Sequence, residues 1–303
     1  MAMKSCFVEV CGREMHYTEW GADASWPDKP VLIMWHGLTR CARDFDIPAK
    51  YYSDIYRVLC PDTLGRGLSQ WAVEMEEYSV RSYAKQAGEF VSKTCGENAI
   101  VDWFGTSMGG IIAINACTAG GPLDGRIRKL LLNDIGPELN QAAIQEIAKN
   151  AGNQPIMDKF TDLVAHLRRM YEVAVGPAEG ELDFTLSTQH IYRRLPDGRY
   201  TLHFDPRIGT IVQQRATRLV SESDDPWTEY DKCTAKEILA VRGTKSMLLL
   251  EEGHQKLASR GLACPVRLVE VPDKGHAPLF ATPEELQLSD SFFRDGQSQC
   301  ALQ

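Results

Sequence analysis

One short segment of this chain has the residue types and the flanking sequence that nucleophilic chemistry needs. Gly105-Thr106-Ser107-Met108-Gly109 follows an apolar run, Ala99 to Phe104, and precedes a run of small residues, Gly110 to Ala119. This order predicts a sharp turn between a strand and a helix that pushes a serine hydroxyl into solvent. The glycines permit the strained dihedral angles of such a turn. We therefore expect Ser107 to be a nucleophile.

A serine hydroxyl is a poor nucleophile until a base removes its proton, and one of the seven histidines has a suitable position. His276 lies in a loop directly after the apolar run Val266 to Val271. Open α/β sheets place their chemistry in loops at the carboxyl ends of strands, so we expect His276 to be the base. Five others fit ordinary surface or core positions: His16, His166, His190, His203 and His254.

Attack on a carbonyl group also needs hydrogen-bond donors for the negative oxygen of the tetrahedral intermediate. The first expected donor is the backbone amide of Met108, directly after the nucleophile. The second is the amide of Leu38, because His36-Gly37-Leu38 follows the apolar run Val31 to Trp35. Backbone amides suit this role because they are fixed before the reaction begins.

Six segments spread over most of the chain match one family pattern in order: Trp35 to Arg40, Pro61 to Ser69, Gly105 to Gly110, Leu132 to Pro137, Val241 to Gly243 and Gly275 to Pro278. In these segments the chain resembles the α/β-hydrolase superfamily, in particular its small serine esterases with a cap. The resemblance implies a serine nucleophile and no metal or organic cofactor. The superfamily also contains thioesterases, lactonases, C–C hydrolases and receptors, so the resemblance is more specific for fold than for chemistry.

The segment Arg242 to Met247 departs from the family pattern. In similar proteins it reads Arg-Gly-x-x-Ser-Asp, and the aspartate orients the histidine, whereas here Met247 stands in its place. Loss of that acid from a serine triad costs roughly 10⁴ in turnover. We expect Asp134, at the end of the apolar run Ile127 to Leu132, to supply the carboxylate, since some members of the superfamily resemble that arrangement.

Two other carboxylates remain open as the acid. Glu251 and Glu252 lie a short loop beyond Met247, and their longer side chains could reach back toward the histidine. Asp134 would then only cap a loop or the first helix that follows it.

The elements that must position these residues alternate along the chain. Apolar runs predict strands at Cys6 to Cys11, Glu14 to Trp20, Val31 to Trp35, Tyr56 to Cys60, Ala99 to Phe104, Ile127 to Leu132, Ile238 to Val241 and Val266 to Val271. The first two form a hairpin. Helical stretches such as Val80 to Thr94 and Gly110 to Thr118 lie between most of the others. The pattern predicts an α/β fold, with a mostly parallel eight-stranded sheet and helices on both faces.

One interruption of this alternation is too long for a plain loop. We interpret residues 136–226 as a helical cap inserted into a hydrolase core made of residues 1–135 and 227–303. The cap residues Met170 and Tyr171 lie in an apolar pattern of helical spacing, and we expect them to line the substrate pocket together with Trp35.

Two arginine pairs in the same interruption are open to two interpretations. Arg168-Arg169 and Arg193-Arg194 either hold a substrate carboxylate or only charge the surface, and surface charge is the simpler account.

Composition restricts the partners of this protein. The net charge of −8 and a pI near 5.5 argue against a general nucleic-acid binder. No apolar run approaches the roughly 18 residues of a membrane span, and we detect no signal peptide. Nine cysteines without a C-x-x-C pair suggest reduced thiols in the cytoplasm and no structural zinc. A homo-oligomer is compatible with the sequence.

These features together predict a carboxylesterase-like serine hydrolase that cleaves a small-molecule ester through an acyl-enzyme. A C–C hydrolase of the same fold uses similar residues, but its oxyanion loop typically contains more glycine than Leu38-Thr39-Arg40. Because Met247 replaces the usual acid, a degenerate hydrolase that binds a small molecule as a receptor is a further alternative.

Overall fold

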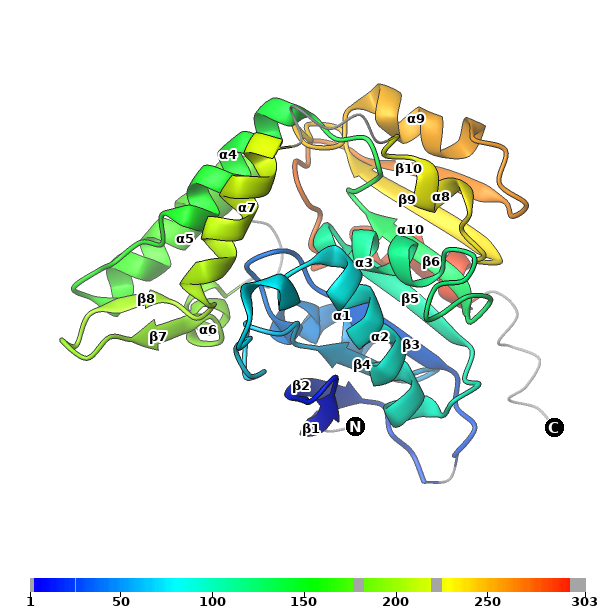
Figure 1. Ribbon diagram of the computed structural model, residues 1–303, viewed down its shortest axis with the longest axis horizontal. Helices are drawn as coiled ribbons and strands as arrows, with labels where there is room; N and C mark the ends of the chain where they lie inside the picture. Colours follow the sequence, from blue (N-terminus) through cyan, green and yellow to red (C-terminus); the bar gives the residue numbers. More distant parts are fainter. Residues whose placement is uncertain (1–2, 25, 177–182, 219–224, 295–303) are drawn as a thin grey trace.

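The computed structural model describes residues 3–24, 26–176, 183–218 and 225–294. An eight-stranded sheet runs through it in the order β1-β2-β4-β3-β5-β6-β9-β10 (Figure 1). The strands are β1 (Lys4–Val10), β2 (Arg13–Trp20), β3 (Val31–Trp35), β4 (Arg57–Pro61), β5 (Val101–Thr106), β6 (Ile127–Asn133), β9 (Glu237–Gly243) and β10 (Val266–Val271). The pairs β1–β2 and β2–β4 are antiparallel, and the other neighbours are parallel. The predicted mostly parallel eight-stranded sheet is confirmed.

Helices cover both faces of this sheet, as the alternation predicted. One face packs against α2 (Val80–Cys95), α3 (Met108–Ala116), α8 (Thr228–Asp231) and α9 (Glu251–Ser259), and the other against α1 (Asp46–Tyr52) and α10 (Pro283–Arg294). Two short 3-10 helices, η1 (Ala42–Phe45) and η2 (Met75–Glu77), lie in connecting loops.

Each central strand contributes side chains to two apolar cores. On β3, Ile33 and Trp35 belong to the core beneath α2 and α3, whereas Leu32 and Met34 belong to the core beneath α1 and α10. Successive side chains of a strand point to opposite faces, so a strand buried on both sides must be apolar throughout. This explains why continuous apolar runs, rather than alternating ones, marked the central strands in the sequence.

The predicted strand bounds agree with the structure for β3 and β10, and differ by a few residues elsewhere. The most informative difference is in β5, which extends through Thr106. Gly105 and Thr106 continue the register with Leu132 and Asn133 on β6. Backbone pairing therefore carries the strand to the residue before Ser107, although Gly105 and Thr106 add little apolar surface.

A separate group of elements connects β6 to β9 and lies to the left of the sheet in Figure 1. It contains α4 (Gln141–Gly152), α5 (Phe160–Ala174), α6 (Phe184–Gln189), β7 (Tyr192–Arg194), β8 (Tyr200–Leu202) and α7 (Pro206–Arg218). We call this segment the cap. The predicted helical cap missed the β7–β8 hairpin, because three-residue strands are too short to show a period. Residues 177–182 and 219–224 of the predicted 136–226 unit, and 1–2, 25 and 295–303 of the predicted core, lie outside the described residues.

Three further findings concern the described ranges only. Their eight cysteines are all free thiols. No cluster of three or more histidine, cysteine, aspartate or glutamate side chains there is arranged to hold a metal ion. No helix within those ranges combines the length and apolar character that crossing a membrane requires.

Candidate active site

The turn between β5 and α3 holds Ser107 in a strained conformation. Its φ of 51° and ψ of −117° lie outside the regions that L-residues favour. The Ser107 amide donates to the carbonyl of Asn133 on β6, at 3.0 Å. Gly109 must lack a side chain, because a Cβ there would overlap the carbonyl oxygen of Trp35. The close packing of α3 on β3 therefore fixes the turn and the direction of the serine side chain.

Three side chains from three different loops form a continuous hydrogen-bonded chain. Ser107 Oγ lies 2.9 Å from His276 Nε2, and His276 Nδ1 lies 2.7 Å from Asp134 Oδ2. A proton on Nδ1 that points at the carboxylate leaves Nε2 free to accept from the serine hydroxyl. The structure thus brings together the expected nucleophile, base and acid in an order that permits proton transfer from the serine.

Asp134 is held rigidly at the end of β6. It is fully buried and has a left-handed φ of 52°. Its amide donates to Val241 O at 2.7 Å, while its carboxylate accepts from Gly243 N at 2.9 Å and from Ser246 Oγ at 2.6 Å. With the bond from His276, the carboxylate has three donors, which fix its position. The sequence pattern assigns no role to Ser246, which matches the serine of Arg-Gly-x-x-Ser-Asp directly before Met247.

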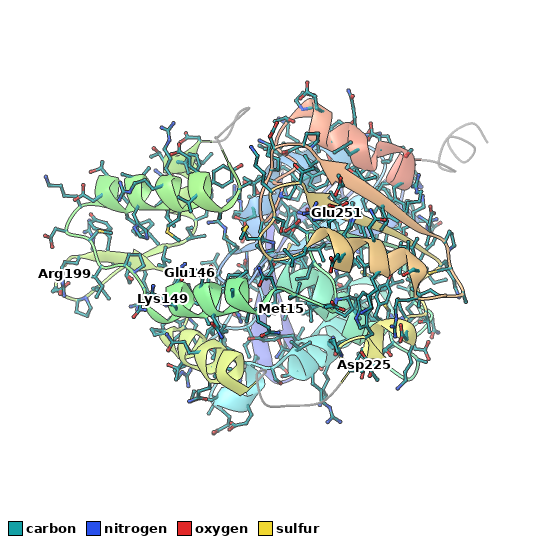
Figure 2. The ribbon with its side chains drawn as sticks, turned by 90° about the horizontal axis from the view of Figure 1, so that it is seen from above. Met15, Glu146, Lys149, Arg199, Asp225 and Glu251 are labelled. Carbon is teal, nitrogen blue, oxygen red and sulfur yellow. The ribbon has the colours of Figure 1, made fainter. Side chains whose placement is uncertain are left out.

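The alternative acids lie elsewhere. Glu251 and Glu252 are exposed in the first turn of α9, and neither is hydrogen-bonded to His276. Figure 2 labels Glu251 on that helix. The structure therefore favours Asp134 over either glutamate as the acid. Carboxylates are favoured in the first turn of a helix by its exposed amides, which accounts for both residues without any role beside His276. Met247 points into solvent, with 69% of its surface exposed.

The two expected oxyanion donors flank Ser107. Leu38 lines the cavity that contains Ser107, and Met108 is the first residue of α3. The first amides of a helix have no carbonyl one turn earlier to bind. Among the residues that the structure describes, neither the Leu38 amide nor the Met108 amide donates a hydrogen bond to another protein group. Both amides are therefore available to a ligand.

His36 supports the loop that carries Leu38. It is fully buried, its Nε2 accepts from Thr63 N at 2.9 Å, and its Nδ1 donates to Gly37 O at 2.7 Å. Burial lowers the pKa of His36 to about 4. The ring is neutral at neutral pH, as both hydrogen bonds require.

This low pKa predicts a loss of stability in acid. In the unfolded chain His36 binds its proton with an ordinary pKa near 6.5, whereas the native value is about 4. As pH falls from 6.5 to about 4, the native protein should lose about 3 kcal/mol from this group alone. Above pH 6.5 the contribution is complete and no longer varies with pH. Urea unfolding at a series of pH values will measure it, and His36→Gln should show a shallower decline. Equal slopes in the two proteins would contradict the assignment.

A cavity of about 370 Å³ opens above Ser107 and His276, between the sheet and the cap. Most of its wall is apolar and comes from the cap, including Met170 and Tyr171, as expected. Trp35 does not line it, which corrects that prediction. The Trp35 ring is fully buried, stacks on Trp103 at 5.2 Å between centroids, and donates to Thr63 Oγ1 at 2.8 Å. The alternation along β3 directs it into the core beneath α2 and α3.

The charged side chains of the cavity compensate one another. Arg40 donates to both oxygens of Asp44, at 2.8 and 2.6 Å, and to Ser187 Oγ on α6 at 3.3 Å. His166 also lines the wall, and burial, with a smaller contribution from Arg169, lowers its pKa. The sequence pattern assigned no role to Arg40, which belongs to the oxyanion loop, or to Asp44, four residues later in η1. The wall thus offers hydrogen-bonding groups while carrying little net charge.

The two arginine pairs lie outside the cavity wall. Arg168 pairs with Glu172 on the surface of α5, and Arg193 lies over the ring of Trp71. None of the four side chains lines the cavity, so the account of surface charge fits better than a carboxylate site.

A second chain of serine, histidine and aspartate lies on the β1–β2 hairpin. Ser5 Oγ is 2.7 Å from His16 Nε2, and His16 Nδ1 is 2.7 Å from Asp62 Oδ2. Asp62 also accepts from the amides of Ala42 and Leu68. Ser5 is exposed on a strand at the edge of the sheet and is not part of the wall of the cavity above Ser107. We interpret these contacts as a link between the hairpin and the loop after β4.

Comparison with known proteins agrees with this geometry. A model of the alpha/beta hydrolase family matches residues 32–286. The 3-hydroxybutyrate-oligomer hydrolase of Cupriavidus necator is 34% identical over 300 residues, which cover 95% of each chain. A solved structure of a Rickettsia typhi protein described as a hydrolase has a TM-score of 0.81 and 25% identity, over 97% of this chain and 99% of that one. An alpha/beta hydrolase from Novosphingobium aromaticivorans has a TM-score of 0.74 and 28% identity, over 95% and 96%.

Proposed function

Since this chain belongs to the alpha/beta hydrolase family, we propose that it cleaves carboxylic esters through an acyl-enzyme formed on Ser107. The observation that carries this proposal is the hydrogen-bonded chain from Ser107 through His276 to Asp134, which faces a cavity. A nucleophile, a base in reach of it and a group that orients the base are the three parts that acyl transfer requires.

In the first half of the reaction, Ser107 Oγ attacks the ester carbonyl carbon while His276 Nε2 takes the hydroxyl proton. The carbonyl oxygen becomes negative and is held by the amides of Leu38 and Met108. His276 then gives its proton to the alcohol oxygen, the carbon–oxygen ester bond breaks, and the acyl group stays on Ser107. Asp134 stabilises the imidazolium that forms in between.

In the second half, water replaces the alcohol. His276 Nε2 takes a proton from water, the hydroxide oxygen attacks the acyl carbon, and a second oxyanion forms in the same place. The proton returns to Ser107 Oγ as the acid product leaves. The same three side chains therefore serve both halves.

The relative and the cavity together support a substrate class. The curated relative is named for oligomers of 3-hydroxybutyrate, and it is 34% identical to this chain over 95% of each protein. Such oligomers combine methyl branches and ester carbonyls with a hydroxyl group at one end and a carboxylate at the other. The cavity has a mostly apolar wall with hydroxyl and amide groups, among them Ser187, Thr39 and Asn150. Its volume of about 370 Å³ suits a short oligomer. We propose short 3-hydroxybutyrate oligomers as substrates.

Two alternatives, a small-molecule receptor and a C–C hydrolase, have less support than ester hydrolysis. A receptor built on a degenerate hydrolase was suggested by Met247 in the usual acid position, but Asp134 supplies a carboxylate to His276. Cleavage of a carbon–carbon bond uses similar residues, yet the oxyanion loop has a single glycine, Gly37, before Leu38 and the relative is named for ester hydrolysis.

The test compares substrates. We expect the wild type to release 3-hydroxybutyrate from both enantiomeric series of dimer and trimer, with kcat/KM for the better series at least about tenfold above that for p-nitrophenyl acetate. Rapid quenching should trap a 3-hydroxybutyryl group on Ser107, detected by peptide mass spectrometry. Glu251→Gln, with its change on the exposed face of α9, is the matched control and should behave as wild type.

Three results would contradict the proposal in different ways. Cleavage of p-nitrophenyl esters without cleavage of the oligomers would reject the substrate class. Cleavage of a vinylogous diketone in preference to any ester would favour the C–C hydrolase. A rise in melting temperature with oligomers, without turnover, would favour a binding protein.

A further inference from the structure

The loop after β4 carries a buried arginine for which the reaction above has no role. Arg66 is 1% exposed. Its guanidinium donates to Leu64 O at 2.8 Å and to Tyr83 Oη at 2.7 Å, and it forms no ion pair with any carboxylate in the described ranges. It also lies over the Tyr78 and Tyr83 rings, 5.8 and 5.2 Å from their centroids. Burying a cation without an anion costs folding free energy. The burial of Arg66 therefore indicates a role other than stabilising the fold.

The remaining contacts of Arg66 reach both residues whose amides flank the nucleophile. Nε donates to the carbonyl oxygen of Leu38 at 2.9 Å, and Nη2 lies 3.6 Å from Met108 Sδ. Leu38 lies in the loop after β3, whereas Met108 begins α3. One planar guanidinium thus spans the two separate segments that would hold the oxyanion.

The backbone that presents this guanidinium is itself fixed. Gly67 has a φ of +51°, and a Cβ there would overlap the carboxylate of Asp62. Asp62 accepts from the Leu68 amide at 2.9 Å. The backbone of Arg66 forms a bridge with Phe204, which lines the cavity. The arginine is therefore anchored between the sheet, the oxyanion loop and the cap.

We propose that Arg66 is a positioning residue for the oxyanion site. Its guanidinium holds Leu38 and Met108 at the spacing that directs both amides to one oxygen, and its buried positive charge stabilises the negative charge that develops there. The inference rests on the proposed acyl transfer at Ser107.

The test separates charge from geometry with two variants. Arg66→Met keeps much of the volume but removes the charge and the donors, and should lower kcat for p-nitrophenyl butyrate about 10²-fold with KM little changed. Arg66→Lys keeps the charge but loses the planar fork, and should lower kcat about tenfold. Thermal melting of each variant checks that it is folded.

Binding of a transition-state analogue distinguishes a positioning role from a merely structural one. A structural role would not change the affinity for the analogue relative to the affinity for the product. Phenylboronic acid forms a tetrahedral adduct with an active-site serine, whereas free 3-hydroxybutyrate binds as a product. In each variant, affinity for the boronate should fall by the same factor as kcat/KM, while the inhibition constant of the product stays at the wild-type value.

Arg207→Lys is the matched control. Arg207 lies at the same distance from the Tyr78 ring, 5.8 Å, but donates to Asp205 and to backbone carbonyls away from Leu38 and Met108. It should leave kcat and boronate affinity unchanged.

The outcomes distinguish this inference from the proposed function. If the wild type shows no Ser107-dependent ester turnover, the proposed function fails and the inference fails with it. If the wild type is active and both folded variants keep its kcat and boronate affinity, only the inference is wrong. An equal loss of boronate and product affinity would also overturn it, because the role would then be structural. If Arg66→Met does not fold, the result with Arg66→Lys decides.

Discussion

Replacing Ser107 with alanine should lower kcat for short esters by about 10⁶-fold, to the residual rate that binding and the oxyanion donors alone sustain. The hydroxyl is the atom that would form the bond to the acyl carbon, and it lies 2.9 Å from the nitrogen that would take its proton. Removing it ends covalent catalysis while leaving His276 and Asp134 in contact. The measurement is the hydrolysis of p-nitrophenyl acetate, butyrate and octanoate, with far-UV circular dichroism to confirm folding.

The chain contains its own control for this experiment. Ser5 Oγ likewise contacts a histidine, His16, at 2.7 Å, and His16 contacts Asp62. Ser5 is exposed, however, and lies outside the wall of the cavity above Ser107. Ser5→Ala should keep wild-type kcat and KM. If Ser107→Ala retained more than about one part in a hundred of the activity while Ser5→Ala lost it, the nucleophile would be misassigned.

The second large effect is expected at Asp134. Asp134→Asn should lower kcat about 10⁴-fold, because an amide cannot hold the imidazole in the tautomer that accepts the serine proton, nor stabilise the imidazolium. The asparagine fits the same volume and still accepts one bond from Gly243 N or Ser246 Oγ. The loss should therefore appear in kcat much more than in KM or in thermal stability.

The controls for Asp134 are the two glutamates that follow Met247, Glu251 and Glu252. Glu251→Gln and Glu252→Gln change exposed side chains on α9 and should leave kcat unchanged. Near-complete activity of Asp134→Asn, with a loss in either glutamate variant, would reverse the assignment. Stopped-flow kinetics with p-nitrophenyl butyrate resolve acylation from deacylation, and both steps should slow in Asp134→Asn, since His276 acts in each.

The fold was predictable from the sequence because its signals are local. A run such as Val31 to Trp35 is apolar on both faces, and the backbone pairing of a central parallel strand requires that. The sharp turn at Ser107 was equally predictable, because the close approach of α3 to β3 excludes a side chain at Gly109. Both are properties of a few consecutive residues.

The surroundings of the site depend on contacts between distant segments, and these left no local signal. Ser246 Oγ meets Asp134 across 112 positions of the chain, and Arg66 reaches Met108 across 42. The direction of Trp35 was predicted wrongly because adjacency to the oxyanion loop suggested the cavity, whereas the pleat of β3 turns the ring away from it. Tertiary packing decides such details.

The place of Asp134 also bears on where the acid of such a triad can lie. β6 and β9 are neighbours in the sheet, and the amide of Asp134 is bonded to Val241, so the loops after both strands begin beside His276. A carboxylate on either of these two loops would therefore start close to the same histidine. The absence of an aspartate after the penultimate strand is thus compatible with a complete triad, because the neighbouring loop offers a carboxylate at 2.7 Å from His276 Nδ1.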